Sequence, residues 1–317
     1  MKIYVNIAFL ENLFLADEET DRHINIKKLL SSSQSKFEVI VDVDIEKIYQ
    51  EALTDPTKRE TRTFLRQIVQ KLPTSDLTFL TACQNIEFYE SGEPKLFFMD
   101  DVLLNISQNF GCFHVSSGSL ELADFLFYAE EIRIDKKQRD WSSLKDVKHP
   151  CNALVVTDNY LFSDEDIYLE NIRSICENLM PATLASGFKF DVTLIGHNPN
   201  KDFRPVKDQH KMLADYFKDK FPFLVNLTIV RETYHDRYIF TNYYRIVSGN
   251  GFALFKNKQL LPGKRTTVHC KSLVHEGRLS STYQTRSEEL KECAAINRRN
   301  GEASGRMAGD GLNRLLQ

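Results

Sequence analysis

The stretch "NALVVTDNYLFSDEDIYLENIRSICENLMP", residues 152–181, decides the fold, because it has the pattern of a buried strand followed directly by a helix. Its first part is apolar and rich in β-branched residues, which favour strands, and it ends in the polar residues Asp158 and Asn159. Ser163 is the predicted N-cap of the helix, acidic residues fill the first helical turn, and Pro181 lies beyond its end. A β-α unit therefore begins here.

The same order continues toward the C-terminus. Residues 188–200, "FKFDVTLIGHNPN", predict the next strand and its exit loop, and residues 206–221 predict a second helix. Residues 224–232, "LVNLTIVRE", predict a third strand, and a hairpin-like stretch, 233–255, follows it. This β-α-β-α-β-hairpin order indicates an α/β fold with a mainly parallel sheet and helices on its faces. Ligands on such sheets bind beyond the carboxyl ends of the strands.

The first half of the chain also alternates strand-like and helix-like segments, so we predict an N-terminal α/β domain of residues 1–145. Residues 2–10, "KIYVNIAFL", predict its first strand. The polar stretch 135–150 ends in a proline and is the predicted boundary. The second domain then spans residues 150–275. The polar C-terminal tail, residues 280–317, is short of large apolar residues, and we expect part of it to be poorly packed or a loose helix.

The net charge of −3 hides an asymmetry along the chain. Residues 201–317 contain 21 Lys and Arg against 12 Asp and Glu, which leaves 20 against 32 in residues 1–200. A basic second half on an acidic first half indicates that an anion meets the second half. Complementarity between two parts of one protein explains the asymmetry equally well. The 42% hydrophobic and 27% charged residues are typical of a globular chain and exclude a disordered one.

The six cysteines are scattered, without CxxC spacing and without clustering with histidine. This pattern predicts reduced, mostly buried thiols in a cytoplasmic protein, and it argues against a disulfide framework and a zinc site. We expect no metal and no cofactor, since no metal-ligand spacing and no Gly-rich phosphate loop occurs in the sequence. No apolar run approaches the roughly 20 residues of a membrane helix, so we expect no membrane partner.

The hairpin-like stretch, "TYHDRYIFTNYYRIVSGNGFALF", carries a spaced set of polar residues. Arg237 follows His235 by two positions, Asn242 comes after four further residues, and Gly249 comes after six more. This spacing resembles the motif H-x-K-(x4)-D-(x6)-G-S-x-N of the phospholipase D superfamily, with identical residue types at the His and Gly positions. Arg237 stands in the Lys place, Asn242 in the Asp place and Asn250 in the Ser place.

The sequence "HDRY" before a hairpin is similar to the divergent single-motif branch of that superfamily. This branch includes the C-terminal phospholipase D-like domain of MIT-domain proteins and bacterial relatives in conflict and defence systems. The similarity covers roughly residues 150–270, about the size of one compact domain. It leaves the first 150 residues unassigned, and Phe252 departs from the motif, which has Asn at that place.

The resemblance implies a metal-independent phosphodiesterase chemistry. In active members a His attacks the phosphorus, a second His protonates the leaving oxygen, and Lys and Asn groups hold the phosphate charge. His235 is then the nucleophile and Arg237 holds the phosphate, with Asn242 as the third catalytic position. With one motif per chain, the second His comes from a two-fold related subunit or from elsewhere in the chain, so we expect a homodimer. Asn242 offers no carboxylate to orient an imidazole, and an Arg fork differs in geometry from Lys, which favours binding over hydrolysis.

Further candidates lie at or just past predicted strand ends, where a ligand site of an α/β sheet forms. Asp158, Tyr160 and His197 are the predicted phosphate-binding residues there, together with Gly249 and Asn250 of the hairpin. Structural roles explain some of the same residues, because Asn and Gly serve turn geometry and an exposed loop histidine such as His197 is often inert.

The placement of the hairpin residues also leads to an expectation. Residues two apart on a strand share a face, so His235 and Arg237 should project into one crevice. The intervening Asp236 should then point the other way, toward the protein.

Two functions from different classes follow from the sequence. The first is a phospholipase D-like protein of a bacterial defence or conflict system that binds a phosphodiester, with or without cleaving it, nucleic acid being the expected partner of the basic half. The second is a catalytically inactive domain of the same fold that acts in dimerisation or partner docking, with residues 1–145 as the interaction half. A phosphoinositide-headgroup role is a third hypothesis, and the missing hydrophobic or polybasic insertion segment argues against it.

Overall fold

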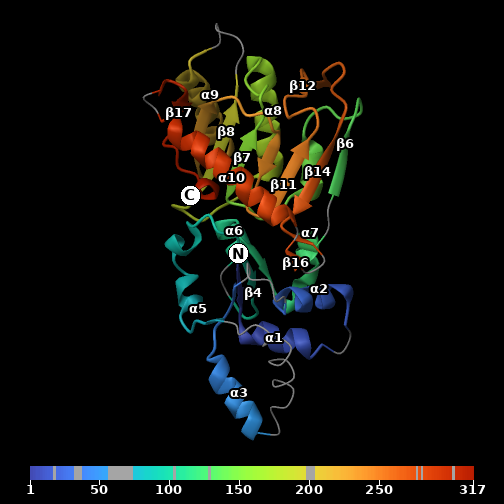
Figure 1. Ribbon diagram of the computed structural model, residues 1–317, viewed down its shortest axis with the longest axis vertical. Helices are drawn as coiled ribbons and strands as arrows, with labels where there is room; N and C mark the ends of the chain where they lie inside the picture. Colours follow the sequence, from blue (N-terminus) through green and yellow to red (C-terminus); the bar gives the residue numbers. More distant parts are fainter. Residues whose placement is uncertain are drawn as a thin grey trace.

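Figure 1 shows a computed structural model of the chain, in which two β-sheets follow each other along the long axis. Sheet A lies in the lower half of the view and sheet B in the upper half. The α/β fold predicted from the sequence is confirmed, with parallel strands in both sheets. The structure describes residues 1–16, 19–31, 38–55, 74–102, 105–127, 130–197, 204–275, 278–279, 281–301 and 304–317.

Sheet A is parallel throughout its described strands, in the order β3-β2-β1-β4-β5. Its members are β1 (Lys2–Val5), β2 (Glu38–Val41), β3 (Thr74–Ser75), β4 (Lys95–Phe98) and β5 (Phe113–Val115). The first strand is shorter than the sequence predicts, because Asn6 caps helix α1 (Ile7–Phe14). The Asn6 side chain accepts a hydrogen bond from the Phe9 amide at 3.1 Å, which is the usual way to begin a helix.

Sheet B is mixed, in the order β17-β9-β8-β7-β10-β11-β14-β6. The central strands β7, β8 and β9 are parallel to one another, and the flanking strands pair antiparallel with their neighbours. The bounds are β6 (Glu130–Ile134), β7 (Ala153–Thr157), β8 (Lys189–Gly196), β9 (Leu224–Arg231), β10 (Tyr238–Phe240), β11 (Tyr244–Ser248), β14 (Thr266–Ser272) and β17 (Met307–Ala308).

Helices α8 (Glu165–Leu179) and α9 (Val206–Lys220) cover one face of sheet B (Figure 1). Successive side chains of a strand alternate between the two faces, so Leu154 and Val156 of β7 point to this side. They share a hydrophobic core with Ile172 of α8. Both predicted helices are confirmed, and the N-cap of α8 is the residue after the predicted Ser163.

The opposite face of sheet B is covered by α10 (Ser281–Arg299). Val155 of β7 points to this side and packs in a second core with Leu290 and Cys293 of the helix. The expectation of a loose tail is therefore wrong for α10, because its polar composition conceals a narrow apolar stripe that the alternate residues of β7 bury.

Shorter elements complete the described fold. Within the described residues, no helix has the length and apolar character that spanning a membrane requires. The spacing of Phe64, Leu65, Ile68, Val69 and Leu72 in the sequence also predicts a helix, and these residues lie outside the described ranges. Further helices are α2 (Asp21–Leu30), α3 (Ile45–Thr54), α5 (Phe79–Ala82), α6 (Ile106–Phe110), α7 (Asp124–Phe127), and the 3-10 helices η2 (Ile86–Tyr89), η3 (Ser117–Ala123), η4 (Ser142–Val147) and η6 (Arg314–Leu316); two small hairpins are β12 (Phe255–Lys256) with β13 (Gln259–Leu260) and β15 (Val274–His275) with β16 (Arg278–Leu279).

The polar stretch 135–150, predicted as a domain boundary, is built into the sheet B half of the molecule. β6, which precedes it, pairs with β14. Trp141 within it is fully buried, and its indole N–H donates hydrogen bonds to Asn171 Oδ1 at 2.9 Å and to the Phe252 carbonyl at 3.2 Å. The two sheets therefore do not divide the chain at this stretch.

The turn between β10 and β11 is buried where the two sheets meet. The Tyr243 hydroxyl donates a hydrogen bond to the Lys95 carbonyl of β4 at 2.7 Å and accepts one from the Phe113 amide of β5 at 2.8 Å. The side-chain oxygen of Asn242 accepts a hydrogen bond from the Asn152 amide, just before β7, at 2.9 Å. The hairpin of sheet B is thereby fastened to sheet A.

His149 is buried beside this turn. Its Nδ1 lies 2.8 Å from the Val147 carbonyl oxygen and its Nε2 lies 2.6 Å from Thr241 Oγ1. A carbonyl oxygen only accepts, so Nδ1 carries the proton and Nε2 accepts a hydrogen bond from the Thr241 hydroxyl. Burial lowers the pKa of His149 from 6.5 to about 4, because the charged ring would lose its hydration.

We predict that this histidine makes the fold sensitive to mild acid. Below pH 6.5 the unfolded chain binds a proton at His149, whereas the folded ring binds it only near pH 4. The contribution of the neutral ring to the free energy of unfolding is therefore present above pH 6.5 and is lost as the pH falls toward 4. Between pH 7 and pH 4.5 the loss is about 2–3 kcal/mol of the free energy of unfolding. Urea titrations of wild type and His149→Gln at both pH values measure it, and equal pH dependence of the two proteins would contradict the assignment.

All six cysteines are free and buried, as the sequence predicts. Burial raises the pKa of Cys112 to about 11 and the pKa of Cys83 and Cys151 to about 12, because a thiolate is disfavoured away from water. These thiols are therefore protonated and shielded at neutral pH.

The thiol chemistry of the native protein follows from that burial. We expect all six cysteines to react with an aromatic disulfide reagent in denaturant without prior reduction, and to react far more slowly in native buffer. The rate in native buffer then reports opening of the fold. Two or more thiols that stay blocked in non-reducing denaturant would contradict the assignment of six free cysteines.

Candidate functional site

The carboxyl ends of β7 and β8 meet the start of β10 at one side of sheet B, here named the carboxyl edge. Tyr238 of β10 lies opposite Thr157 of β7 in the antiparallel pair, so the residues before β10 lie beside the residues after β7. Val247 of β11 lies opposite Tyr238, so the end of β11 is at the same edge. The topology brings together seven of the eight predicted site residues: Asp158, Tyr160, His197, His235, Arg237, Gly249 and Asn250.

Asn242 is the exception, because it follows β10 and lies at the other end of that strand from His235. The four residues between Arg237 and Asn242 are the three residues of β10 and one residue of the turn. The side-chain amide of Asn242 donates a hydrogen bond to Asn152 Oδ1 at 2.9 Å, and this side chain is buried. The structure therefore gives Asn242 a role in the hairpin turn and does not bring it to the other candidates.

Asp158 is the buried acid of the carboxyl edge. Its carboxylate accepts hydrogen bonds from the amides of Tyr160 at 2.9 Å and Phe252 at 2.6 Å, which orders the loops after β7 and β11. Gly251 lies against it with φ +80°, and a Cβ there would be 2.3 Å from Asp158 Oδ2. Burial raises the pKa of Asp158, and the two amides and the charge of Arg237 oppose that rise.

Arg237 reaches across the edge from the start of β10 to the end of β11. Its Nη1 donates a hydrogen bond to the Gly249 carbonyl, and its guanidinium carbon lies 5.8 Å from the centre of the Tyr160 ring. The Nε of Arg237 has no hydrogen-bond partner in the described part of the chain. A carbonyl, an aromatic ring and the nearby charge of Asp158 therefore fix the half-buried guanidinium in a defined place.

His235 and Asp236 lie in an irregular segment, because β10 begins only at Tyr238. Both side chains are exposed. The Thr157 hydroxyl donates a hydrogen bond to the Asp236 carbonyl at 3.0 Å and accepts one from the Tyr238 amide at 3.0 Å, which fixes the backbone here. The expectation that Asp236 points into the protein is therefore wrong, since without strand geometry the alternation of side chains does not apply.

His197 directly follows β8, and its side chain is exposed. The preceding Gly196 leaves no room for a side chain, because a Cβ there would be 2.6 Å from the Asp158 carbonyl oxygen. The Glu232 amide donates a hydrogen bond to the Gly196 carbonyl at 2.9 Å. The segment that carries His235 thus leaves sheet B directly beside the loop that carries His197, and both imidazoles belong to the carboxyl edge.

Gly249 and Asn250 act through the backbone and the turn. The Gly249 carbonyl is the acceptor that positions Arg237. The Asn250 amide N–H donates to Thr266 Oγ1 at 3.3 Å, and its side chain donates to the Arg265 carbonyl at 2.6 Å. These contacts tie the end of β11 to the start of β14, so both residues hold the edge together.

Two arginines that the sequence places in the tail also reach the carboxyl edge. Guanidinium nitrogens of Arg299 and Arg306 lie 3.9 Å and 3.7 Å from the Glu232 carboxylate, and the side-chain amide of Asn300 donates a hydrogen bond to that carboxylate at 3.0 Å. Both arginines are more than half exposed, at 59% and 63%. Exposed ion pairs at such distances contribute little, so both cations remain accessible to a ligand. No spacing in the sequence connects them to the hairpin, because the antiparallel pairing of β17 with β9 brings Arg306 there and Arg299 is the last residue of α10.

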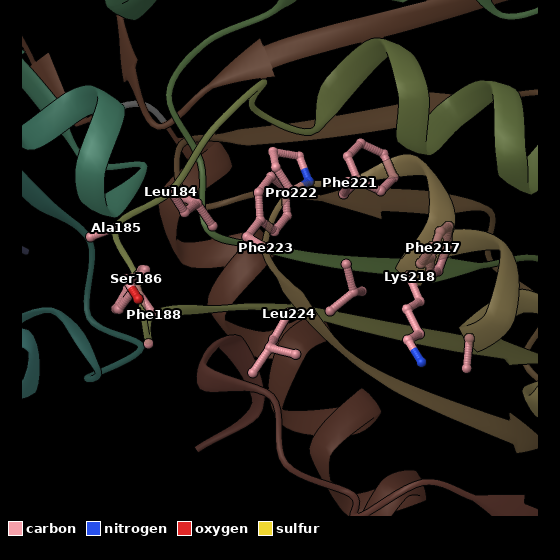
Figure 2. A pocket seen from close by; sticks show the side chains of 13 residues that line it. Leu184, Ala185, Ser186, Phe188, Phe217, Lys218, Phe221, Pro222, Phe223 and Leu224 are labelled. Carbon is pink, nitrogen blue, oxygen red and sulfur yellow. The ribbon is translucent and has the colours of Figure 1, made fainter.

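A cavity of about 550 Å³ lies at the amino ends of β8 and β9, at the other end of these strands from the carboxyl edge (Figure 2). Its walls come from the loop before β8, the end of α9 and the start of β9. The described residues that line it include none of the predicted site residues. Lys218 is the one charged residue among these lining residues. The large apolar ones are Leu184, Phe188, Phe217, Phe221, Phe223 and Leu224.

No protein-family model matches the chain, and no curated protein matches it.

The geometry around Asp158 predicts a difference between two neighbouring glycines. Gly251→Ala places a Cβ in the Asp158 carboxylate and forces a side chain into the left-handed region, so it should lower the free energy of unfolding by about 1–3 kcal/mol. Gly249→Ala is the matched control, because its Cβ would lie 3.3 Å from Thr266 Oγ1. Urea titration measures both variants, and equal destabilisation would contradict the close packing of Gly251 on Asp158.

Proposed function

We propose that the carboxyl edge of sheet B binds a phosphodiester. One observation carries this proposal: the guanidinium of Arg237, held by the Gly249 carbonyl and the Tyr160 ring, lies at the same edge as the exposed imidazoles of His235 and His197. Guanidinium N–H groups are charge-assisted donors that suit phosphate oxygens, and an imidazole N–H also donates to them. The resemblance of the spacing of His235, Arg237 and Gly249 to the phospholipase D motif supports the same ligand.

Nucleic acid is the ligand class that we propose. Arg299 and Arg306 extend the cationic edge beyond Arg237, which suits a chain of phosphates better than a single one. Residues 201–317 contain more basic than acidic residues, which favours binding of an anionic polymer. The buried thiols support a cytoplasmic location for such a protein.

The hydrolytic form of the proposal uses both imidazoles. A nitrogen of His235 forms a bond to phosphorus while the bond from phosphorus to the leaving oxygen breaks, and the leaving oxygen takes a proton from the protonated ring of His197. A water molecule then attacks phosphorus, its proton passes to His197, and the bond from phosphorus to His235 breaks. His197 thus supplies the second imidazole within one chain, and a two-fold related subunit is the other source, which a homodimer would provide.

We propose that binding is the dominant activity of this edge. Asn242, in the place where the family motif has Asp, lies at the far end of β10 and is engaged with Asn152. No carboxylate at that position orients the His235 ring.

The proposal predicts separate effects of two substitutions. Arg237→Ala removes a charge-assisted contact and should weaken binding of single-stranded oligonucleotides about tenfold or more. His235→Ala should abolish any hydrolysis while leaving binding within a few fold, because a nucleophile is needed for the reaction and not for docking. Fluorescence anisotropy and gel assays on single- and double-stranded DNA and RNA at two salt concentrations measure both effects.

Arg133→Ala is the matched control, because Arg133 lies on β6 at the far side of sheet B and is 81% exposed. It should bind like wild type. Wild-type protein that binds none of these nucleic acids would contradict the proposal and leave the inactive docking module as the function. Equal binding by wild type and Arg237→Ala would remove Arg237 from the site.

A further inference from the structure

A cavity of about 330 Å³ lies where α10 and the C-terminal helix η6 face the loop before β4 of sheet A. In Figure 1, α10 crosses the molecule near this junction of the two sheets. Arg314 in its wall bonds to the start of β8, and Arg286 bonds to the turn after β10, so the cavity is at the opposite end of sheet B from the carboxyl edge. Its polar lining residues are Glu93, Tyr283, Arg286, Ser287, Lys291, Arg298, Arg314 and Gln317.

Arg286 is a buried cation in this wall, with only 2% of its surface exposed. One terminal nitrogen donates a hydrogen bond to the Thr241 carbonyl, and the Nε has no hydrogen-bond partner in the described part of the chain. Burial lowers the pKa of Arg286 to about 10, which still leaves the side chain charged at neutral pH. Glu289, whose charge acts on Arg286, is itself paired with Arg245 at 2.5 Å, and a buried guanidinium without a carboxylate of its own is costly unless an anion compensates it.

Arg314 is the second buried cation, with 6% of its surface exposed. Its Nε donates to the Asp191 carboxylate at 2.9 Å and its Nη2 donates to the Lys189 carbonyl at 2.9 Å. Its Nη1 has no hydrogen-bond partner among the described residues. Arg314 is thus held rigidly by its other nitrogens, with one donor group unused.

The charges around the cavity do not balance. Asp191 compensates Arg314, and Glu93, the acidic side chain among the lining residues, is engaged by the Met1 ammonium at 3.0 Å and by Lys2 at 3.9 Å. Gln317, the last residue, also lines the cavity, and its terminal carboxylate offsets one of the remaining positive charges. Within the described residues, no carboxylate lies within 4.0 Å of a charged nitrogen of the three remaining cations, which are Arg286, Lys291 and Arg298. Buried Lys95 adds to the excess, because its Nζ contacts the neutral Ser91 hydroxyl.

We propose that this cavity is a second anion site, which takes the phosphate groups of a small phosphorylated molecule. Buried Arg286 and Arg314, each with one unpartnered nitrogen, line the cavity, and exposed Lys291 and Arg298 of α10 line it beside them. The site differs in place and residues from the carboxyl edge, so it does not depend on the function proposed there. Its walls come from both halves of the molecule, so a bound anion would hold α10 against the loop before β4 and stabilise the folded state.

Titration with pyrophosphate at constant ionic strength tests this proposal, by calorimetry and by the thermal unfolding temperature. We expect wild type to bind with a saturable isotherm and to unfold at a higher temperature as pyrophosphate is added. Lys291→Ala combined with Arg298→Ala should weaken that binding at least about tenfold, because two cations of the cavity lining are removed. Both side chains are exposed, so this variant should fold.

Two controls separate this site from other sources of anion binding. Lys218→Ala with Lys220→Ala removes two exposed cations from α9, away from the cavity, and should bind pyrophosphate like wild type. Arg237→Ala should also bind like wild type, because it alters only the carboxyl edge. The proposal is overturned if wild type shows no saturable binding, if the Lys291 and Arg298 variant retains it, or if Arg237→Ala loses it.

Discussion

The buried turn between β10 and β11 is the constraint on which the rest of the structure depends. Tyr243 in this turn bonds to the backbone of β4 and β5, and Asn242 bonds to the backbone before β7. A polar side chain buried without its partners would cost a few kcal/mol, so these contacts hold the hairpin in one position relative to both sheets. The register of β10 on β7 follows, and with it the position of every residue at the start of β10.

The fixed position of this turn determines the arrangement of residues at both ends of sheet B. At one end it sets Tyr238 opposite Thr157, which brings Arg237 to the loop that Asp158 organises. At the other end the Thr241 carbonyl of the same turn accepts a hydrogen bond from Arg286 of α10, which lines the cavity between α10 and the loop before β4. β10 is only three residues long, so a cationic edge and a cationic cavity lie at the two ends of one short strand.

The sequence predicts the frame of the site better than its details. Parallel strands end at one edge, so Asp158 and His197 could be placed there from strand positions alone. Asn242 could not be placed, because motif spacing does not show that a three-residue strand separates it from Arg237. No pattern in the sequence marks Gly251, because its close contact with Asp158 joins residues far apart in the chain. The position of Arg306 at the carboxyl edge depends on the pairing of β17 with β9, which joins residues far apart in the chain.

The most direct test of the central claim is hydrogen exchange measured by mass spectrometry, with and without a single-stranded oligonucleotide. Amides slow their exchange where a ligand covers or orders the backbone. A phosphodiester at the carboxyl edge predicts slower exchange in peptides that cover residues 158–162, 232–238 and 249–252, with unchanged exchange in the peptides of sheet A. Unchanged exchange in those three segments while the oligonucleotide is bound would contradict the claim.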